Sequence, residues 1–367
     1  MQKKLIAVAV LGACVAGSAL AANVDVYGRI DTGLSYVHQK IGDQAGTDTL
    51  SMDSGLSSGN RWGLKGSEDL GNGYQVGFVL ESGFSSDTGA IGEEGKLFNR
   101  EATLRVSGPF GSIYAGRMAR IGSDAGSVGF YAGSVSPFGS GWGEMPGHFA
   151  VTANYDSRYN NALAYVSPKV GPVTVYAQYT MGNATENESG DDRLFSLGAQ
   201  ADFGALQVLG LVEYLNKKSV ADTTVYDDSK YDDSYTINLG GSYDFGVAKV
   251  FLAGQYFNAA PNFAGQGSTW HDSFDGFGVN VGASAPIGAG EFLVSAGYGK
   301  GDYHVDTKDT NRSADSYIFQ VGYTYPFSKR TNLYAGAGYH QTTMEEEVGK
   351  DSKTKTTQVM FGLLHKF

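Results

Sequence analysis

The stretch RWGLKGSEDLGNGYQVGFVLE, residues 61–81, decides the fold because apolar and polar side chains alternate along both of its halves. The short polar turn 69–73 joins the two halves. One parity carries Trp62, Leu64, Tyr74, Val76, Phe78 and Leu80, and the other carries Arg61, Lys65, Gln75 and Glu81. Since successive side chains of a β-strand point to opposite faces, the stretch predicts a β-hairpin with one apolar and one charged face.

Residues 1–21 are predicted to be a secretory signal peptide, which leaves 22–367 as a single mature domain. A basic start is followed by a short apolar run, and the residues Ala-Leu-Ala at 19–21 match an A-x-A cleavage signal. An apolar run this short does not span a membrane as a helix. Two alternatives are a surface helix of a soluble domain and a lipoprotein cleavage box at 11–14.

The composition excludes several classes of protein. The formal net charge of −11 argues against non-specific binding of nucleic acid. The only cysteine, Cys14, lies in the predicted signal peptide, so we expect neither disulfides nor thiolate chemistry in the mature chain. The 53 glycines and 23 tyrosines, against 8 prolines, are typical of many strands joined by tight turns. No later segment has the roughly 18 consecutive apolar residues of a membrane helix.

Period-2 alternation recurs along the whole predicted mature chain and indicates about sixteen strands. The predicted strands are 24–37, 60–69, 74–84, 97–107, 111–117, 158–167, 173–181, 193–203, 205–215, 234–245, 248–258, 274–285, 291–300, 315–326, 331–343 and 357–367. In the last of these, Val359, Phe361 and Leu363 share one face with the terminal Phe367. The pattern therefore predicts an all-β chain.

The connections between these strands alternate between short and long. The short ones are 69–73, 108–111, 168–172, 203–204, 245–247, 286–290 and 326–330, and the long polar ones are 38–59, 85–96, 118–157, 182–192, 216–233, 259–273, 301–314 and 344–356. Outer-membrane barrels have short periplasmic turns, long external loops and about ten residues per tilted strand. Lipid forces such a sheet to close, because an open edge would leave backbone groups unpaired.

We therefore predict a transmembrane antiparallel β-barrel of about sixteen strands, with a large soluble β-domain as the alternative. In this barrel the apolar face of the hairpin 61–81 meets lipid or a neighbouring subunit. The charged face of the hairpin lines a water-filled lumen.

The sequence contains no motif for catalysis, metal binding or cofactor binding. The six histidines form no H-E-x-x-H pair, and no G-x-S-x-G motif is present. We therefore expect a protein that is not an enzyme and holds neither a metal nor a cofactor. An outer-membrane barrel hydrolase and an adhesin or structural barrel closed by its loops remain the alternatives to a channel.

The chain resembles the general trimeric porins of Gram-negative outer membranes over its whole predicted mature length. The residues that carry the resemblance are VDVYGRIDTGL at 24–34, RWGLKGSEDLGNG at 61–73, FNREATLRVSG at 98–108, GSIYAGR at 111–117, YPFSKRTNLYAGAGYH at 325–340 and the terminal Phe367. The resemblance implies a sixteen-stranded homotrimer in the cell outer membrane of a Gram-negative bacterium. It also implies passive diffusion of ions and small hydrophilic solutes, with no catalysis.

In this family the third external loop folds into the lumen, and its acidic residues face basic residues on the wall. The stretch 118–157 stands in that position, and SPFGSGWGEMPG at 136–147 looks like the family's Pro-Glu-Phe-Gly bend without its glutamate. The resemblance implies a pore wall of Arg29, Arg61, Arg100, Arg158 and Arg117, and loop acids drawn from Asp124, Glu144 and Asp156. It also makes Phe367 an assembly signal for the barrel-assembly machinery.

Arg100 presents a conflict between parity and resemblance. Strict alternation along 97–107 points Glu101 and Arg105 into the lumen and Arg100 outward, whereas the resemblance places Arg100 in the lumen. A bulge between 100 and 104 would invert the faces and reconcile the two. We expect Arg100 to point inward, because an unpaired arginine facing lipid is costly.

Two further properties concern the outside of the barrel and its ions. Acidic clusters at 227–228, 232–233 and 345–347 lie in predicted external loops, where they are solvated tips, sites of divalent-ion bridging to lipopolysaccharide, or sites of cation capture at the mouth of the channel. Acidic loops favour cations, whereas wall arginines favour anions. The sequence therefore leaves the ion preference of the channel open.

Overall fold

The computed structural model describes residues 23–145, 147–182, 193–216, 233–264, 266–267, 272–305, 308–345 and 351–367. The predicted signal peptide lies outside these residues. The strands of the main sheet are β1 (Asn23–Ile41), β2 (Thr47–Ser54), β3 (Arg61–Gly71), β4 (Tyr74–Gly83), β5 (Glu101–Gly108), β6 (Gly111–Ala119), β7 (Arg158–Val166), β8 (Val173–Thr180), β9 (Arg193–Phe203), β10 (Leu206–Asn216), β11 (Ser234–Asp244), β12 (Lys249–Ala260), β15 (Asp272–Ile287), β16 (Gly290–Val305), β17 (Lys308–Pro326), β18 (Thr331–Met344) and β19 (Ser352–Lys366). Four short elements complete the described secondary structure: β13 (Asn262–Phe263), β14 (Gln266–Gly267), α2 (Ala132–Val135) and η1 (Gly147–Ala150).

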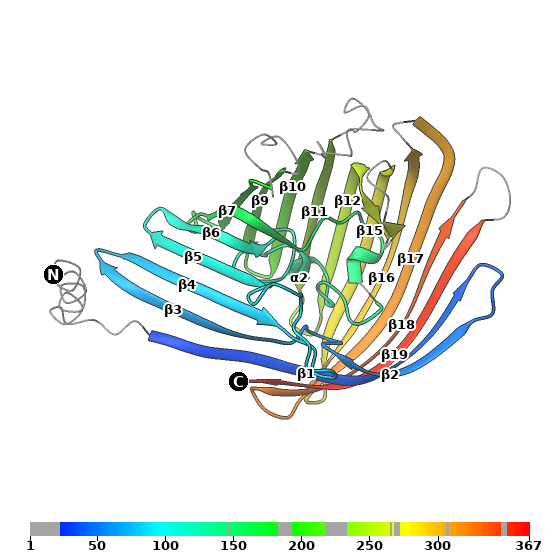
Figure 1. Cartoon of the computed structure of the whole chain (residues 1–367), viewed down its shortest axis with the longest axis horizontal. Helices are drawn as coiled ribbons and strands as arrows, with labels where there is room; N and C mark the ends of the chain where they lie inside the picture. The colour runs from blue at the N-terminus through cyan, green and yellow to red at the C-terminus, as the bar shows by residue number, and fades with distance from the viewer. Residues whose placement is uncertain are drawn as a thin grey trace, which may run out of the picture.

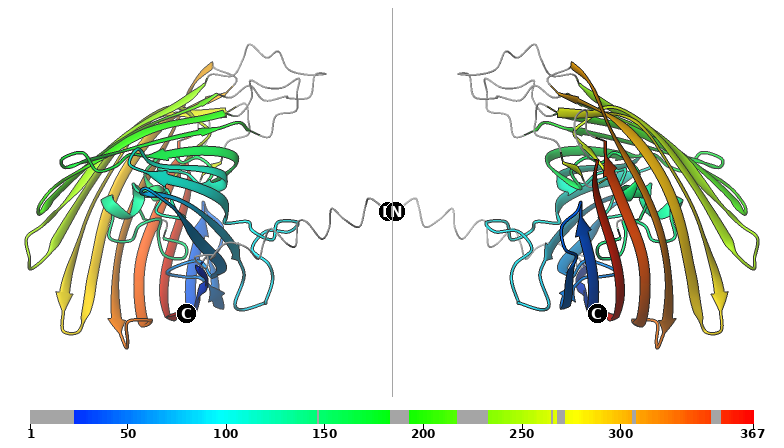
Figure 2. Two further views of the ribbon diagram at one scale, coloured as in Figure 1. Left: turned by 90° about the vertical axis from the view of Figure 1, so that its left-hand side faces the viewer. Right: turned by 90° about the vertical axis from the view of Figure 1, so that its right-hand side faces the viewer.

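The main sheet closes on itself through its first strand. One edge of β1 pairs with β19, and the other edge pairs with β2 over Thr32–Gln39 and with β3 over Asn23–Arg29. Because β2 and β3 share one edge of β1, they act as a single barrel strand, and the barrel has sixteen. Figure 1 shows β1 and β19 side by side, and Figure 2 shows the strands tilted around the wall. The predicted all-β antiparallel barrel is confirmed.

Two predicted long loops contain strand. Residues 47–54, inside the predicted loop 38–59, form β2 and pair with β1. The predicted loop 301–314 is also too long, since β16 runs to Val305 and β17 begins at Lys308. In β2 only Leu50 and Met52 are large apolar residues, which is too few to mark a strand by apolar alternation.

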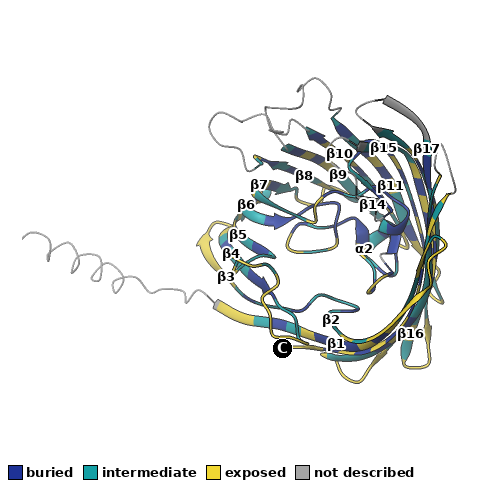
Figure 3. Cartoon of the chain, turned by 45° about the vertical axis from the view of Figure 1, so that its right-hand side comes forward, coloured by how far each residue is buried: buried dark blue, intermediate teal, exposed yellow. Residues whose placement is uncertain are grey.

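The two faces of the sheet differ in chemistry along the whole ring. The outer face carries large exposed apolar residues, such as Leu50 and Leu239, which are 76% and 65% exposed. The inner face carries polar residues that are almost fully buried, such as Glu213 and Gln358. Figure 3 shows this alternation of exposed and buried positions along the strands. None of the described helices is long and apolar enough to cross a membrane.

The long segment between β6 and β7 is held by side chains of the inner face. Gln178 of β8 accepts a hydrogen bond from the Ile121 amide at 3.1 Å and donates one to the Ala119 carbonyl at 2.9 Å. Gln255 of β12 accepts from the Ala153 amide at 2.6 Å and donates to the Ala153 carbonyl at 3.1 Å. A side-chain amide suits this task because it offers both a donor and an acceptor.

Apolar contacts hold the same segment at two further places. In one cluster, Val128, Phe130 and Val135 pack with inner-face residues of β6, β7 and β10. In a second cluster, Phe138 and Trp142 pack with residues of β16 to β19. The element α2 contacts β11 and β12, and η1 contacts β16 and β17. These contacts leave the sector formed by β1 to β5 as the part of the inner wall with few apolar contacts to the segment.

Candidate functional site

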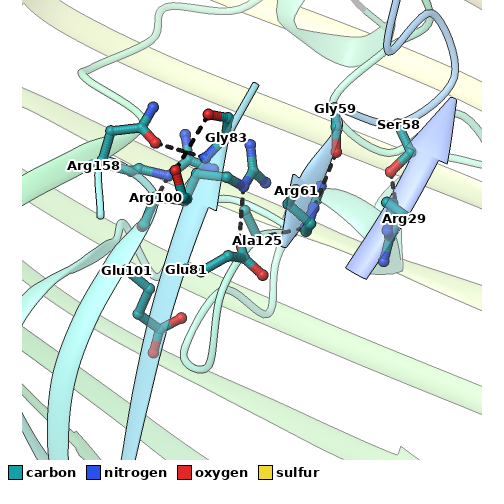
Figure 4. A network of polar contacts seen from close by, with 12 residues as sticks. Arg29, Ser58, Gly59, Arg61, Glu81, Gly83, Arg100, Glu101, Ala125 and Arg158 are labelled. Carbon is teal, nitrogen blue, oxygen red and sulfur yellow. Dashed lines mark hydrogen bonds and ion pairs between the residues drawn. The ribbon is translucent and has the colours of Figure 1, made fainter. Parts of the chain in front are cut away.

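Four of the arginines singled out in the sequence lie together on the inner wall. Arg29 lies on β1, Arg61 begins β3, Arg100 directly precedes β5, and Arg158 begins β7. All four line one cavity of about 1100 Å³, and Figure 4 shows their side chains around Glu81. The fold therefore brings these four arginines, from four different parts of the chain, into one cluster.

Glu81 of β4 is the carboxylate at the centre of this cluster. The Nε of Arg100 donates to Glu81 Oε1 at 2.7 Å, and a terminal nitrogen of Arg61 lies 3.8 Å from the same oxygen. The hydroxyl of Tyr27 donates to Glu81 Oε2 at 3.1 Å. Arg158 joins the cluster by donating from Nε to the Arg100 carbonyl at 3.0 Å. Because the Glu81 side chain is only 7% exposed, these partners supply most of its solvation.

Arg100 points inward towards Glu81, and the pairing of β4 with β5 has no bulge between 100 and 104. The pairing of β4 with β5 is regular from Glu81 opposite Glu101 to Gln75 opposite Ser107. Arg100 lies just before β5, where its amide still donates to the Glu81 carbonyl at 3.2 Å. The strand begins one residue later, so parity along β5 does not determine the direction of the Arg100 side chain. No bulge is therefore needed to reconcile parity and resemblance, because Arg100 lies outside the strand.

The turn 55–60 between β2 and β3 positions the other two arginines. The Asp31 carboxylate accepts hydrogen bonds from the amides of Ser57 and Ser58, at 2.9 and 2.7 Å, and thereby fixes the turn. Residues of this turn then hold the two arginines. Ser58 Oγ accepts a hydrogen bond from Arg29, and the Gly59 carbonyl accepts one from Arg61 Nε at 3.0 Å. Asp31 is therefore a positioning residue that sequence analysis did not name.

Two of the three candidate loop acids line the same cavity as the arginines. The Asp124 carboxylate is held by Ser140, whose amide donates to it at 2.9 Å and whose hydroxyl also donates. The Glu144 amide donates to the Gln358 side chain of β19 at 2.8 Å, while the Glu144 residue itself is exposed. Neither carboxylate forms an ion pair in the described part of the chain.

Arg117 and Asp156 lie in a neighbouring cavity of about 960 Å³. Arg117 donates to Asn160 Oδ1 at 2.6 Å and pairs with Glu93 at 3.1 Å. The hydrogen bond from Lys96 and the charge of Arg117 hold the pKa of Glu93 below its ordinary value. Arg158 lines both cavities, so it connects this group to the four-arginine cluster.

Two carboxylates that sequence analysis did not single out as site residues hold the segment 118–157 to the wall. Glu213 of β10 pairs with Arg120 at 3.0 Å, with both side chains at most 4% exposed. Glu101 accepts hydrogen bonds from the amide and the hydroxyl of Ser127, at 3.0 and 2.5 Å. Glu213 shares the inward face of β10 with Leu209, Leu211 and Leu215. A single carboxylate on an otherwise apolar face was the sequence signal that could have identified it.

The charge around the larger cavity is positive although the whole chain carries −11. Its charged lining residues are Arg29, Arg61, Arg100, Arg120 and Arg158 against Asp53, Asp124 and Glu144. Within the described ranges, no three His, Cys, Asp or Glu residues gather as a possible metal site. The arrangement is suited to holding hydrated charge in a polar passage.

Phe367, the last residue, lies beside the first strand. Its amide and carbonyl pair with the carbonyl and amide of Gly28, both at 3.1 Å. A Cβ atom added to Gly28 would lie 2.4 Å from the Phe367 ring, so the ring packs directly on the glycine. Glycine is therefore required opposite the terminal aromatic residue.

Comparisons with known proteins agree with this architecture. Residues 7–344 match the family model described as Gram-negative porin. An outer membrane porin protein of Bordetella pertussis is 33% identical over 100% of both chains, and outer membrane porin protein 32 of Delftia acidovorans is 30% identical with the same coverage.

Two solved structures share the fold. An anion-selective porin from Comamonas acidovorans has a TM-score of 0.67 at 23% identity, covering 95% of this chain and 100% of that chain. The trimer form of OmpT, an outer membrane protein of Vibrio cholerae, has a TM-score of 0.59 at 17% identity, covering 93% and 99%. With a closed barrel and a family match over most of its length, this chain belongs to the Gram-negative porin family.

Proposed function

We propose that this porin is a passive diffusion channel for ions and small hydrophilic solutes, and that its narrowest part prefers anions. The observation that carries the proposal is the cluster of Arg29, Arg61, Arg100 and Arg158 on one wall of the lumen. Rings of charged side chains set ion preference in pores. An anion preference fits a wall that holds more arginines than carboxylates.

Two nearby carboxylates, Glu81 and Asp124, are engaged by groups of the protein, whereas Asp53 and Glu144 also line the cavity. Glu81 is engaged by Arg100 and Tyr27, so its charge is largely compensated within the wall. The Asp124 carboxylate accepts a hydrogen bond from the amide of Ser140 in the same loop. Like charges about 4 Å apart repel by about 1 kcal/mol even in water, and by more where solvent is thinned. A mobile anion that enters the cluster relieves this repulsion, whereas a cation increases it.

We also propose that the segment 118–157 narrows the lumen opposite these arginines. The support is its attachment along the inner wall, through Gln178 and Gln255 and through the ion pair of Arg120 with Glu213. Because polar groups and two apolar clusters both hold it, the segment acts as a fixed constriction. Arg117 and Asp156 then belong to the entrance that leads to the constriction.

We expect the porin to be a homotrimer that buries the outer face around the first strand. Leu34 of β1 is paired with Met52 on one side and with Phe361 on the other, and all three side chains are exposed in the single chain. Together with Leu50, they form an apolar surface that a second subunit would cover. An apolar surface of this kind also suits lipid, so crosslinking of the purified protein tests the assembly.

The remaining partners follow from the expected location in the envelope. Residues 1–21 would direct export, and Phe367 would mark the barrel for the barrel-assembly machinery. Outer-membrane lipid and lipopolysaccharide would surround the outer face, with divalent ions bridging at the acidic clusters. Most of those cluster residues lie outside the described residues, and Glu345 accepts a hydrogen bond from Ser313 at 2.6 Å.

Single-channel recording in a planar bilayer tests the proposed channel. We expect stable open conductance steps in KCl without any added ligand. A barrel that inserts but passes no current would support the adhesin or structural alternative. Turnover of an ester or peptide substrate by the purified barrel would support the hydrolase alternative.

A further inference from the structure

We propose that Lys65 and Arg105 form a second cationic site that binds a small oxyanion, such as inorganic phosphate, after it leaves the arginine cluster. The inference rests on the proposed anion preference and extends it to a separate place in the lumen. Lys65 lies four residues beyond Arg61 along β3, towards the short turn that leads into β4. Four strand residues span about 13 Å, so the two places are distinct steps along one passage.

The site is a cavity of about 310 Å³ on the inner face of β1 to β6. Its polar lining comes from Asp25, Lys65, Ser67, Thr103, Arg105, Tyr114 and Ser127. Ser127 belongs to the segment 118–157 and is held there by Glu101, which lies beside Glu81 in the strand register. The cavity therefore begins where the arginine cluster and its carboxylates end.

Arg105 is the main reason to expect an anion here. Among the described residues, no carboxylate or hydrogen-bond acceptor pairs with its guanidinium, and its Nε is buried without a partner. A buried guanidinium nitrogen without an acceptor is costly, and an oxyanion can satisfy two guanidinium N–H groups at once.

Gly77 gives the Arg105 guanidinium room to lean across the sheet. A Cβ added to Gly77 of β4 would lie 3.3 Å from a terminal nitrogen of Arg105. The guanidinium of β5 therefore passes over the middle strand towards β3, where Lys65 lies. The absence of a side chain at 77 lets two cations from different strands face one cavity.

Lys65 supplies the second charge. Its ammonium lies 5.3 Å from the centroid of the Tyr27 ring, and no ion pair within the described ranges joins it to a carboxylate. Asp25 is its register partner on β1 and lines the same cavity, so the cavity carries two cations and one carboxylate. The planar guanidinium of Arg105 can bind two oxygens of one anion, and the Lys65 ammonium adds a compact charge beside it. This pair therefore favours a polyatomic oxyanion over chloride.

The test is block of chloride current by inorganic phosphate in single-channel recordings. For the unmodified porin we expect phosphate to reduce the chloride current in a saturable way. Arg105→Gln should raise the half-blocking phosphate concentration about tenfold, and Lys65→Gln should raise it by a smaller factor. Arg105→Lys keeps the charge but loses the planar guanidinium. Its half-blocking phosphate concentration should lie between those of the unmodified porin and Arg105→Gln, so Arg105→Lys replaces Arg105→Gln in the test if the latter does not assemble.

Lys249→Gln is the matched control, because Lys249 is another inner-face cation, on β12, with its ammonium 5.1 Å from the Phe251 ring centroid. It should leave the half-blocking concentration unchanged. Absence of block, an unchanged block in Arg105→Gln, or an equal effect of Lys249→Gln would overturn the site. The KCl reversal potential recorded with the same channels separates the two proposals. An anion preference with unchanged block rejects only the second site, whereas the lack of an anion preference rejects the proposed selectivity on which the site rests.

Discussion

The Nε of Arg100 lies 2.7 Å from Oε1 of Glu81, which joins the residue just before β5 to the neighbouring strand β4 across the inner wall. This contact compensates the carboxylate nearest to the arginine cluster. Among the described residues, the hydrogen-bond partners of Arg29 and Arg158 are uncharged, namely serine hydroxyls and a backbone carbonyl. The wall therefore holds positive charge that mobile anions can neutralise.

Replacing Glu81 tests how far this carboxylate limits the anion preference. Glu81→Gln should shift the reversal potential further towards the anion value, because four arginines would lose their nearest countercharge. It should also lower the free energy of unfolding by about 1–3 kcal/mol, since charge-assisted hydrogen bonds to Arg100 and Tyr27 are weakened. Glu144→Gln, at an exposed position of the cavity that the four arginines line, is the control and should leave stability unchanged. An unchanged reversal potential in Glu81→Gln would contradict the assigned role.

The ion pair between Arg120 and Glu213 predicts a large cost when it is broken. Glu213→Gln should destabilise the barrel by about 3–5 kcal/mol, because Arg120 would remain as a buried and uncompensated charge. Denaturant unfolding measures this cost, and noisier open-channel current would report a loosened segment. Lys169→Gln removes half of an exposed ion pair with Asp202 and should cost under about 1 kcal/mol. Equal effects of the two substitutions would exclude the buried anchor.

His148 in η1 predicts a dependence of stability on pH. Burial lowers the pKa of His148 to about 4, whereas an unfolded histidine titrates near 6.5. Between these values the unfolded chain binds more protons, so stability falls as the pH falls from about 6.5 to about 4. His148→Gln, which does not titrate, should lose less thermal stability than the unmodified porin between pH 7 and pH 4.5. Parallel losses in the two proteins would show that His148 does not contribute.

The contact between Phe367 and Gly28 predicts an assembly defect. Deleting Phe367 should reduce the amount of folded, heat-modifiable barrel more than it reduces export. Gly28→Ala keeps the terminal aromatic residue, but its Cβ would clash with both the Phe367 ring and the Arg61 carbonyl, so it tests the tight packing at this position rather than the aromatic signal itself. If Phe367→Ala assembles normally at native expression levels, Phe367 is only an interfacial aromatic residue.

Most of the barrel could be predicted from the sequence because lipid and lumen impose opposite chemistry on alternate residues. The strand β2 escaped because only Leu50 and Met52 mark its outer face, while its inner residues are small and polar. Its register with β1 shows that it continues the barrel wall. Alternation therefore identifies a strand only where its outer face is rich in apolar residues.

The site could be predicted only in part. Side-chain directions set by a local strand pattern could be predicted, whereas contacts that depend on how distant segments fold together could not. Arg29 and Arg61 lie on regular strands, so their common face follows from parity and resemblance. Arg158 begins β7, whose register against β6 shifts between Gly116 and Met118, so its direction follows from the resemblance alone. The partner of Asp124 is Ser140, and that contact depends on how the segment between β6 and β7 folds back on itself. The pairing of Arg120 with Glu213 joins the segment to β10, and no local pattern connects the two residues.

The reversal potential in a KCl gradient, measured for the unmodified porin and for Arg61→Ser combined with Arg100→Ser, tests the central claim most directly. For the unmodified channel, the reversal potential should have the sign expected when chloride is more permeant than potassium. The double variant should shift towards the cation side with a larger conductance, because two wall charges and two long side chains are removed. Lys353→Ser, at the external end of β19, should change the potential only slightly, since salt screens a distant exposed charge. A cation-selective unmodified channel, or a double variant with unchanged potential and conductance, would contradict the account.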